Sequence, residues 1–161
     1  MLRHLQPSRS LWFVFCNEEH TPWTSVTAAK RARERGDNIV ALFNLDGLAA
    51  KAQPDIDAGR KTNVTLYVCP EGKWLADLMV EVNDTYSIGL EQTTYHAEQP
   101  SDDHGSYIKE GYLAAVHNVG SVPYGDPNYH TPGDVPELVD MENVTMATQA
   151  SLAAIVRVVN G

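Results

Sequence analysis

The chain has 161 residues, of which 43% are hydrophobic and 20% are charged. This length and composition suit one globular domain with a hydrophobic core. The formal net charge of −9 argues against a nucleic-acid or anionic-membrane surface, because phosphate contacts need clustered Lys and Arg. No run approaches the roughly 20 apolar residues of a membrane span, and residues 1–10 lack the apolar core of a signal peptide. We therefore expect a cytoplasmic location by default.

The first half of the chain alternates predicted strands with a helix. The continuous apolar run at residues 11–16 predicts a strand that is buried on both faces. A helix is predicted from about residue 23 to 35, where Gly36 supplies the stop signal. Residues 38–46 and 64–69 are again mostly apolar, and each range predicts a further buried strand.

The second half of the chain is predicted to be richer in helix. Residues 72–86 carry apolar side chains at helical spacing, whereas residues 87–103 have the composition of a loop. A short helix is expected at 104–110, a short strand at 112–117, a long loop at 118–136 and a helix at 137–159. Together these elements predict an α/β fold with a mixed, largely parallel sheet flanked by helices. We assign residues 1–10 to a short lead and residues 11–161 to a single domain.

Acidic side chains follow two of the predicted strands. Glu18 and Glu19 come directly after the first strand, and Asp46 closes the second. Ligands of parallel sheets bind beyond the carboxyl ends of the strands, so these carboxylates should emerge on the same rim. Taken separately, the glutamate pair is also typical of a solvated acidic turn, and Asp46 is typical of a turn cap before Gly47.

A histidine in the long loop extends this set of donors. His130 lies in the segment YHTPGD, where the turn at Thr131 and Pro132 would stiffen the backbone and Asp134 could hold a ring N–H. A lone loop histidine is more often simply exposed, but glutamate, aspartate and histidine together suit zinc in a site with open positions. Structural or surface roles are expected for the other histidines apart from His104, namely His4, His20, His96 and His117.

Four segments together form a pattern that resembles one enzyme family. They are NEEHTPWTS at 17–25, NLDG at 44–47, DHGSYIKEGYLAA at 103–115 and YHTPGD at 129–134. In this order they resemble the EExGLxGS, NLDM, DHxxFxxxGxPA and YHTxxD motifs of the co-catalytic zinc aminopeptidases, a family that also includes glutamate carboxypeptidase and the glutaminyl cyclases. The spacing of 27 residues between Glu19 and Asp46 also matches. The resemblance covers nearly the whole chain from about Leu11.

The resemblance implies a zinc-dependent exopeptidase that removes residues from peptide N-termini and uses one or two Zn²⁺ ions. Glu18 resembles the general base of the family. Glu19 and His130 resemble two ligands of one zinc, and Asp46 resembles a ligand of the second. His104 falls in a stretch that shapes the site in the family, and it is not assigned as a ligand.

The chain also departs from the family pattern. Thr21 and Thr24 replace glycines, Leu113 replaces a proline, and the family's HxD motif and bridging aspartate have no counterpart before residue 11. The chain therefore resembles an N-terminally truncated peptidase domain. We expect it to bind zinc weakly and to have little activity alone, because catalytic zinc usually has three protein ligands.

An unpaired sheet edge would also favour self-association. Two alternatives to a peptidase remain open, a non-catalytic peptidase-like binding module and an inactive fragment of an active parent.

Overall fold

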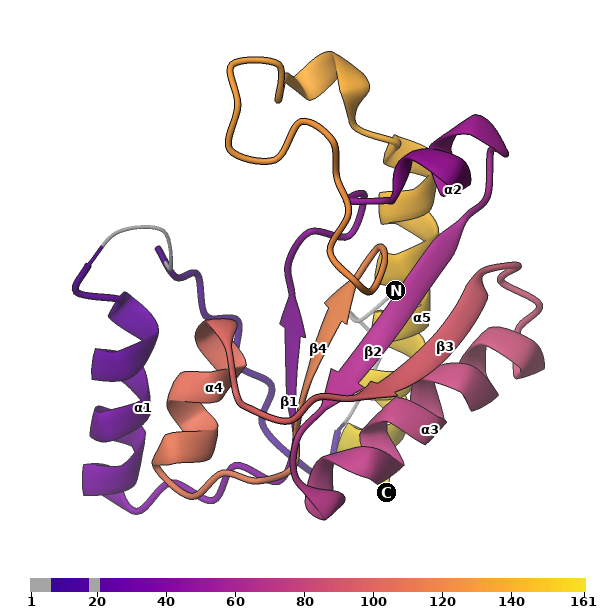
Figure 1. Cartoon of the computed structure of the whole chain (residues 1–161). Coiled ribbons are helices and arrows are strands. Elements are labelled where there is room, and N and C mark those ends of the chain that lie inside the picture. The colour runs from indigo at the N-terminus through magenta and orange to yellow at the C-terminus, as the bar shows by residue number, and fades with distance from the viewer. Residues whose placement is uncertain (1–6, 18–20) are drawn as a thin grey trace.

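The computed structural model describes residues 7–17 and 21–161, and helices alternate with strands along the chain (Figure 1). The described elements are, in order, α1 (Thr24–Arg35), β1 (Leu42–Leu45), α2 (Gln53–Asp57), β2 (Thr62–Tyr67), α3 (Pro70–Thr85), β3 (Glu91–His96), α4 (Asp102–Lys109), β4 (Ala115–Val119), the 3₁₀ turn η2 (Pro136–Leu138) and α5 (Met141–Asn160).

The strands form one mixed sheet in the order β1-β4-β2-β3. β1 pairs with β4 in parallel, β2 pairs with β3 in parallel, and β2 and β4 meet antiparallel. The prediction of a mixed, largely parallel α/β sheet flanked by helices is therefore confirmed. Because β1 and β4 run in the same direction, the residues that follow them emerge at the same rim of the sheet.

The two faces of the sheet carry different helices. On one face, α3 packs against α5, and Val116 of β4 contacts Leu75 and Ala76 of α3. Successive side chains of a strand point to opposite faces, so His117 faces the other side, where its ring contacts that of His104 in α4. α1 packs on the outside of α4 (Figure 1).

Glycine shapes two of these helices, by a positive φ at Gly36 and by a close backbone approach at Gly72. Gly36 has φ of 70°, and its backbone N–H closes the last turn of α1 by donating to Arg33. Gly72 lies in the first turn of α3, where an added Cβ would be 2.7 Å from the carbonyl oxygen of Ala115. The start of α3 therefore rests directly on the backbone of β4.

Asn143 connects α5 to the sheet. This residue is fully buried, and its Oδ1 accepts a hydrogen bond from the backbone N–H of Thr62 at 2.7 Å. Its Nδ2 donates to the carbonyl of Leu48 at 2.6 Å and to that of Thr62 at 2.9 Å. The start of α5 is thereby tied both to β2 and to the turn that follows β1.

Asp140 reinforces the same junction. Its carboxylate caps α5 by accepting from the backbone N–H of Asn143 at 3.1 Å. It also pairs with Lys51 at 2.6 Å and Lys61 at 2.8 Å. Burial alone would raise the pKa of Asp140, but the hydrogen bonds from Lys51, Lys61 and Asn143 outweigh burial and hold this pKa well below its usual range.

The predicted strand at residues 11–16 is wrong. The described residues of this segment form no strand, and the side chains of Phe13 and Phe15 are 69% and 93% exposed. A strand needs a hydrogen-bonded neighbour, and this segment pairs with none of the described strands. The apolar run alone was therefore not enough to predict that this segment is a strand of the sheet.

The loop predicted at residues 87–103 is also wrong in part, because it contains β3. β3 is an edge strand with mostly exposed side chains, so it lacks the apolar signal of a buried strand. The predicted helices at α1, α3, α4 and α5 and the predicted long loop before η2 agree with the structure, whereas α2 was not predicted.

Cys16 and Cys69 are not disulfide-bonded. None of the helices within the described residues has the length and apolar character needed to cross a bilayer.

Candidate metal centre

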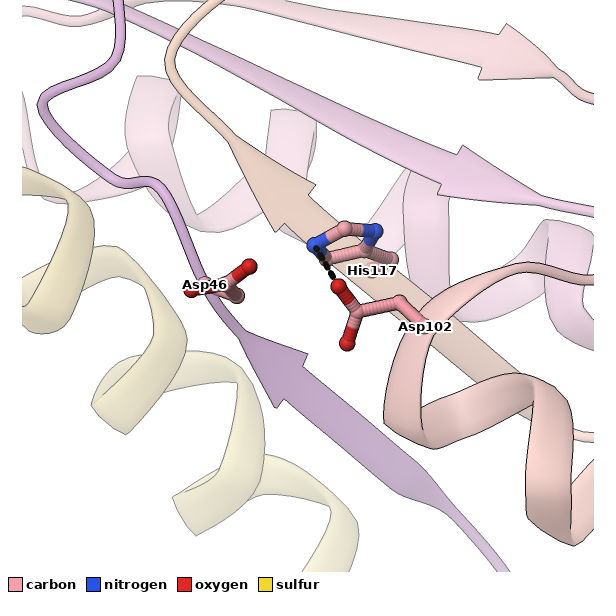
Figure 2. Close-up of side chains that lie close together, drawn as sticks. All are labelled: Asp46, Asp102 and His117. Atoms are coloured by element: carbon pink, nitrogen blue, oxygen red, sulfur yellow. Dashed lines mark ion pairs between the residues drawn. The ribbon is translucent and has the colours of Figure 1, made fainter. Parts of the chain in front are cut away.

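Two carboxylates and one imidazole converge where β1 ends (Figure 2). They belong to Asp46, Asp102 and His117, and one candidate ligand atom from each lies within 4.8 Å of the other two. Asp46 directly follows β1, Asp102 is the first residue of α4, and His117 lies in the middle of β4. The group therefore gathers three separate elements at one rim of the sheet.

The register of the parallel pair explains why these residues meet. Asn44 of β1 is the partner of His117 in β4, so their side chains share a face of the sheet. Asp46 lies two residues beyond Asn44, and its backbone N–H donates to the carbonyl of Asn118 at 3.3 Å. The turn after β1 thus stays beside β4, on the face that α4 covers.

Asp102 is held in a fixed orientation. Its φ of 56° lies in the left-handed region, which residues other than glycine rarely adopt. Its Oδ1 accepts hydrogen bonds from Asn44 Nδ2 and from the backbone N–H of Asp103, both at 2.5 Å. Its Oδ2 lies 3.9 Å from His117 Nε2. One oxygen is therefore anchored, and the other faces the imidazole.

His117 is a buried imidazole with unused nitrogens. Its side chain is only 7% exposed, and neither ring nitrogen has a hydrogen-bond partner among the described residues. Burial lowers the pKa of His117, although the charge of Asp102 and the nearby backbone of Asp46 oppose this effect without reaching hydrogen-bonding geometry. His117 is thus held towards its neutral form, which is the form that binds metals.

His104 lies beside His117 in the interior. Their ring centroids are 5.1 Å apart, and His104 is 2% exposed. The pKa of His104 is lowered to about 4, chiefly by burial and secondarily by the neighbouring His117, against a smaller opposing effect of Asp102. His104 Nδ1 also has no hydrogen-bond partner within residues 7–17 and 21–161. Two neutral rings therefore pack side by side behind the carboxylates.

The long loop after β4 approaches the same rim through aromatic contacts. Tyr124 lies against Gly47, where an added Cβ would be 3.0 Å from the tyrosine ring and from its hydroxyl. Tyr129 meets Tyr124 edge-on with centroids 4.7 Å apart, and His130 stacks on Tyr129 at 3.8 Å. Burial, and secondarily the charge of Asp46, raises the pKa of Tyr124 well above its usual range. These rings connect the His130 loop to the turn that carries Asp46.

The candidate residues chosen from the sequence have different positions. Asp46 is a member of the converging group, whereas His130 is exposed on the loop and is not a member. Glu18 and Glu19 lie outside the described residues. The assignments of Glu18 as base and of Glu19, Asp46 and His130 as ligands therefore stay predictions.

Sequence reasoning did not select Asp102 and gave His117 only a structural or surface role. The available signals were a histidine inside the mostly apolar run AAVHNV and an acidic pair directly before the predicted helix. Neither signal shows that the two residues meet, because 15 positions separate them in sequence. Their contact follows only from the way α4 folds back over β4.

The donor chemistry of this group fits zinc. Carboxylate oxygen and imidazole nitrogen are both zinc ligands, and a catalytic zinc site has three protein ligands with one open position. The unpartnered nitrogens of buried His117 are the observation that supports this fit, since a buried polar atom without a partner is costly. Asp46 is exposed, so the group is accessible from solvent on its side.

The chain is similar to known proteins at the level of family and fold. The model of peptidase family M28 matches residues 1–155. Two crystal structures of LapA from Legionella pneumophila, one titled as an aminopeptidase, superpose with TM-scores of 0.71 and 0.70 at 18% sequence identity. Each alignment covers 85% of this chain and 36% of the LapA chain. A search of curated proteins gave no match. The resemblance to the co-catalytic zinc aminopeptidases is thereby confirmed, and the chain belongs to peptidase family M28.

Proposed function

We propose that this chain acts in a zinc-dependent exopeptidase of the aminopeptidase type, which hydrolyses the first peptide bond of its substrate. The proposal is carried by the place of Asp46, which follows β1 at the sheet rim beside a second carboxylate and a buried imidazole, in a chain of family M28. Ligands of open α/β sheets bind at such rims. The chain spans 36% of the LapA structures, so the activity of a whole enzyme is part of the proposal.

The residues of the chain would have separate roles in hydrolysis. Asp46 would hold one zinc, and Glu19 and His130 would hold another. Bound zinc supplies Lewis-acid polarisation of the scissile carbonyl and lowers the pKa of water towards about 7. Glu18 would accept the proton of the attacking water and donate it to the leaving amine. The substrate would be a peptide with a free N-terminus.

The aromatic loop would limit access of water to this rim. Tyr124 and Tyr129 pack edge-on, and His130 stacks on the second ring. A bound peptide N-terminus would lie beside this loop at the same rim. Exclusion of bulk water strengthens the electrostatic interactions inside such a site.

The test is a peptidase assay of the purified chain with added Zn²⁺ on a panel of aminoacyl anilides. We expect slow turnover that stops on chelation and in the Glu18→Gln variant. Turnover that survives chelation or Glu18→Gln would contradict the proposal. Absence of turnover above the buffer background would favour the alternative of a non-catalytic binding module.

A further inference from the structure

We infer that Asp46, Asp102 and His117 together bind one divalent transition-metal ion, with Asp102 and His117 as ligands that the family motifs do not assign. The inference rests on the positions of the three donors and not on the proposed hydrolysis. From the sequence we expected weak zinc binding, because only Asp46 was available for one of the two ions. The structure adds two further donors to this aspartate.

The separations of the donors suit an ion of this size. Asp102 Oδ2 and His117 Nε2 are 3.9 Å apart, whereas two donors on one tetrahedral zinc are roughly 3.4 Å apart at ordinary Zn–O and Zn–N bond lengths. A small approach of the Asp102 and His117 side chains would therefore bring both to bonding distance. Asp46 already lies within 4.8 Å of them.

The surroundings of His117 and Asp102 favour a bound cation between them over a direct hydrogen bond. A neutral imidazole can donate from one nitrogen and accept at the other, yet neither nitrogen of His117 has a partner among the described residues. Asp102 Oδ1 is already held by two donors, which leaves Oδ2 directed at His117. Two carboxylates and a neutral imidazole carry a charge of −2 in total, which a divalent ion neutralises.

The chemistry of the donors selects the class of ion. Imidazole suits zinc, copper, iron and nickel, whereas Mg²⁺ and Ca²⁺ prefer oxygen donors alone. Mg²⁺ also requires near-octahedral coordination and keeps several waters. Three protein donors with one exposed side fit zinc with a single open position.

The experiment measures metal binding by the purified full chain. Zn²⁺ is titrated in competition with a chromophoric chelator, and Co²⁺ is used as a visible-absorption probe of coordination. Three variants each remove one donor, namely Asp46→Asn, Asp102→Asn and His117→Gln. Asp102→Asn is the sharpest change, because its remaining carbonyl oxygen can still accept from Asn44 and from the Asp103 N–H. Circular dichroism and thermal unfolding check that each variant folds.

Two matched controls accompany these variants. Asp103→Asn removes a neighbouring carboxylate of the same helix, and His96→Gln removes an exposed imidazole in β3. We expect this group to hold about one Zn²⁺ per chain in the wild type and in both controls, with little competition from Mg²⁺. Each of the three donor variants should weaken zinc binding by more than about tenfold, since loss of even a supporting residue around a metal costs 10–100-fold.

Several results would overturn the inference. One is a folded wild type that binds no zinc, and another is zinc affinity that falls equally in Asp102→Asn and Asp103→Asn. A third is loss of zinc in Glu19→Gln and His130→Gln but not in Asp102→Asn or His117→Gln, which would assign the metal to the family ligands alone. Zinc binding without peptide hydrolysis would support the inference and count against the proposed function, so the two can fail separately.

Discussion

Asn44 and His117 are partners across the parallel β1–β4 ladder, and both side chains face the carboxylate of Asp102. Asn44 donates to one oxygen of Asp102 at 2.5 Å, and His117 lies 3.9 Å from the other. The orientation of Asp102 therefore depends on a residue that is not itself a candidate ligand.

This relationship predicts the effect of Asn44→Ala. Removal of the amide should free Asp102 to rotate, so zinc affinity should fall by about 10–100-fold. The free energy of unfolding of the metal-free protein should fall by about 1 kcal/mol, the typical contribution of one hydrogen bond. Chelator competition and denaturant unfolding measure the two effects. Asn38→Ala, at an exposed position before the same strand, is the control, and an equal loss of affinity there would contradict the explanation.

The glutamate pair predicts a division of roles. Glu18→Gln should abolish turnover while the zinc content stays nearly unchanged, because a general base is not needed to hold the ion. Glu19→Gln should lower the zinc content as well as turnover. Metal analysis beside the anilide assay separates the two effects. Equal loss of metal in both variants would show that the roles are assigned wrongly.

Asp140 predicts an acid-sensitive junction at the start of α5. Asp140→Asn should lower the free energy of unfolding at neutral pH by about 2–4 kcal/mol, because it removes the partner of buried Lys51 and weakens the helix cap. Asp77→Asn breaks an exposed pair with Lys73 and should cost less than about 0.5 kcal/mol.

The pH dependence of this effect has a definite sign. The pKa of Asp140 is lower in the folded protein than in the unfolded chain, so the folded state favours the charged carboxylate. Its stabilisation is present above the unfolded value of about 4 and is lost as the pH falls below that value. The stability difference between wild type and Asp140→Asn should therefore shrink below about pH 4. A difference that grows on acidification would contradict this account.

Gly47 predicts a measurable clash with the aromatic loop. Gly47 and Gly59 have φ of 59° and 64°, so alanine is strained at both positions. Only at Gly47 would the new Cβ also meet Tyr124, at 3.0 Å, whereas the space around Gly59 is open. Gly47→Ala should therefore destabilise the protein by about 1–3 kcal/mol more than Gly59→Ala. Combining Gly47→Ala with Tyr124→Ala should recover the excess, and a double variant without recovery would contradict the clash.

Sequence patterns were sufficient where local chemistry determines structure. The stop signal at Gly36 helped to predict α1, and the spacing of apolar residues predicted α3, because each signal lies within one element. Two predictions were wrong in opposite ways: a strand was predicted at residues 11–16 and is absent there, and a loop was predicted where β3 forms. The apolar run lacks a pairing strand among the described elements, and the edge strand lacks an apolar pattern.

The candidate site was predictable only in the part that follows a strand end. Asp46 was selected because it closes an apolar run, and it does lie at the rim. The participation of Asp102 and His117 depends on the parallel register of β1 with β4 and on the return of α4 over that pair. Neither the strand register nor the packing of α4 over β1 and β4 can be read from the spacing of residues within one segment of the sequence.

Gly72 illustrates how far the constraints on this rim extend. A side chain at Gly72 would press on the carbonyl of Ala115, which lies two residues before His117 in the same strand. Displacement of that strand would shift the imidazole relative to Asp102 although Gly72 touches neither residue. A deep mutational scan selected for zinc retention should therefore identify Gly72 as intolerant, and a map of contacts around the metal alone would overlook it.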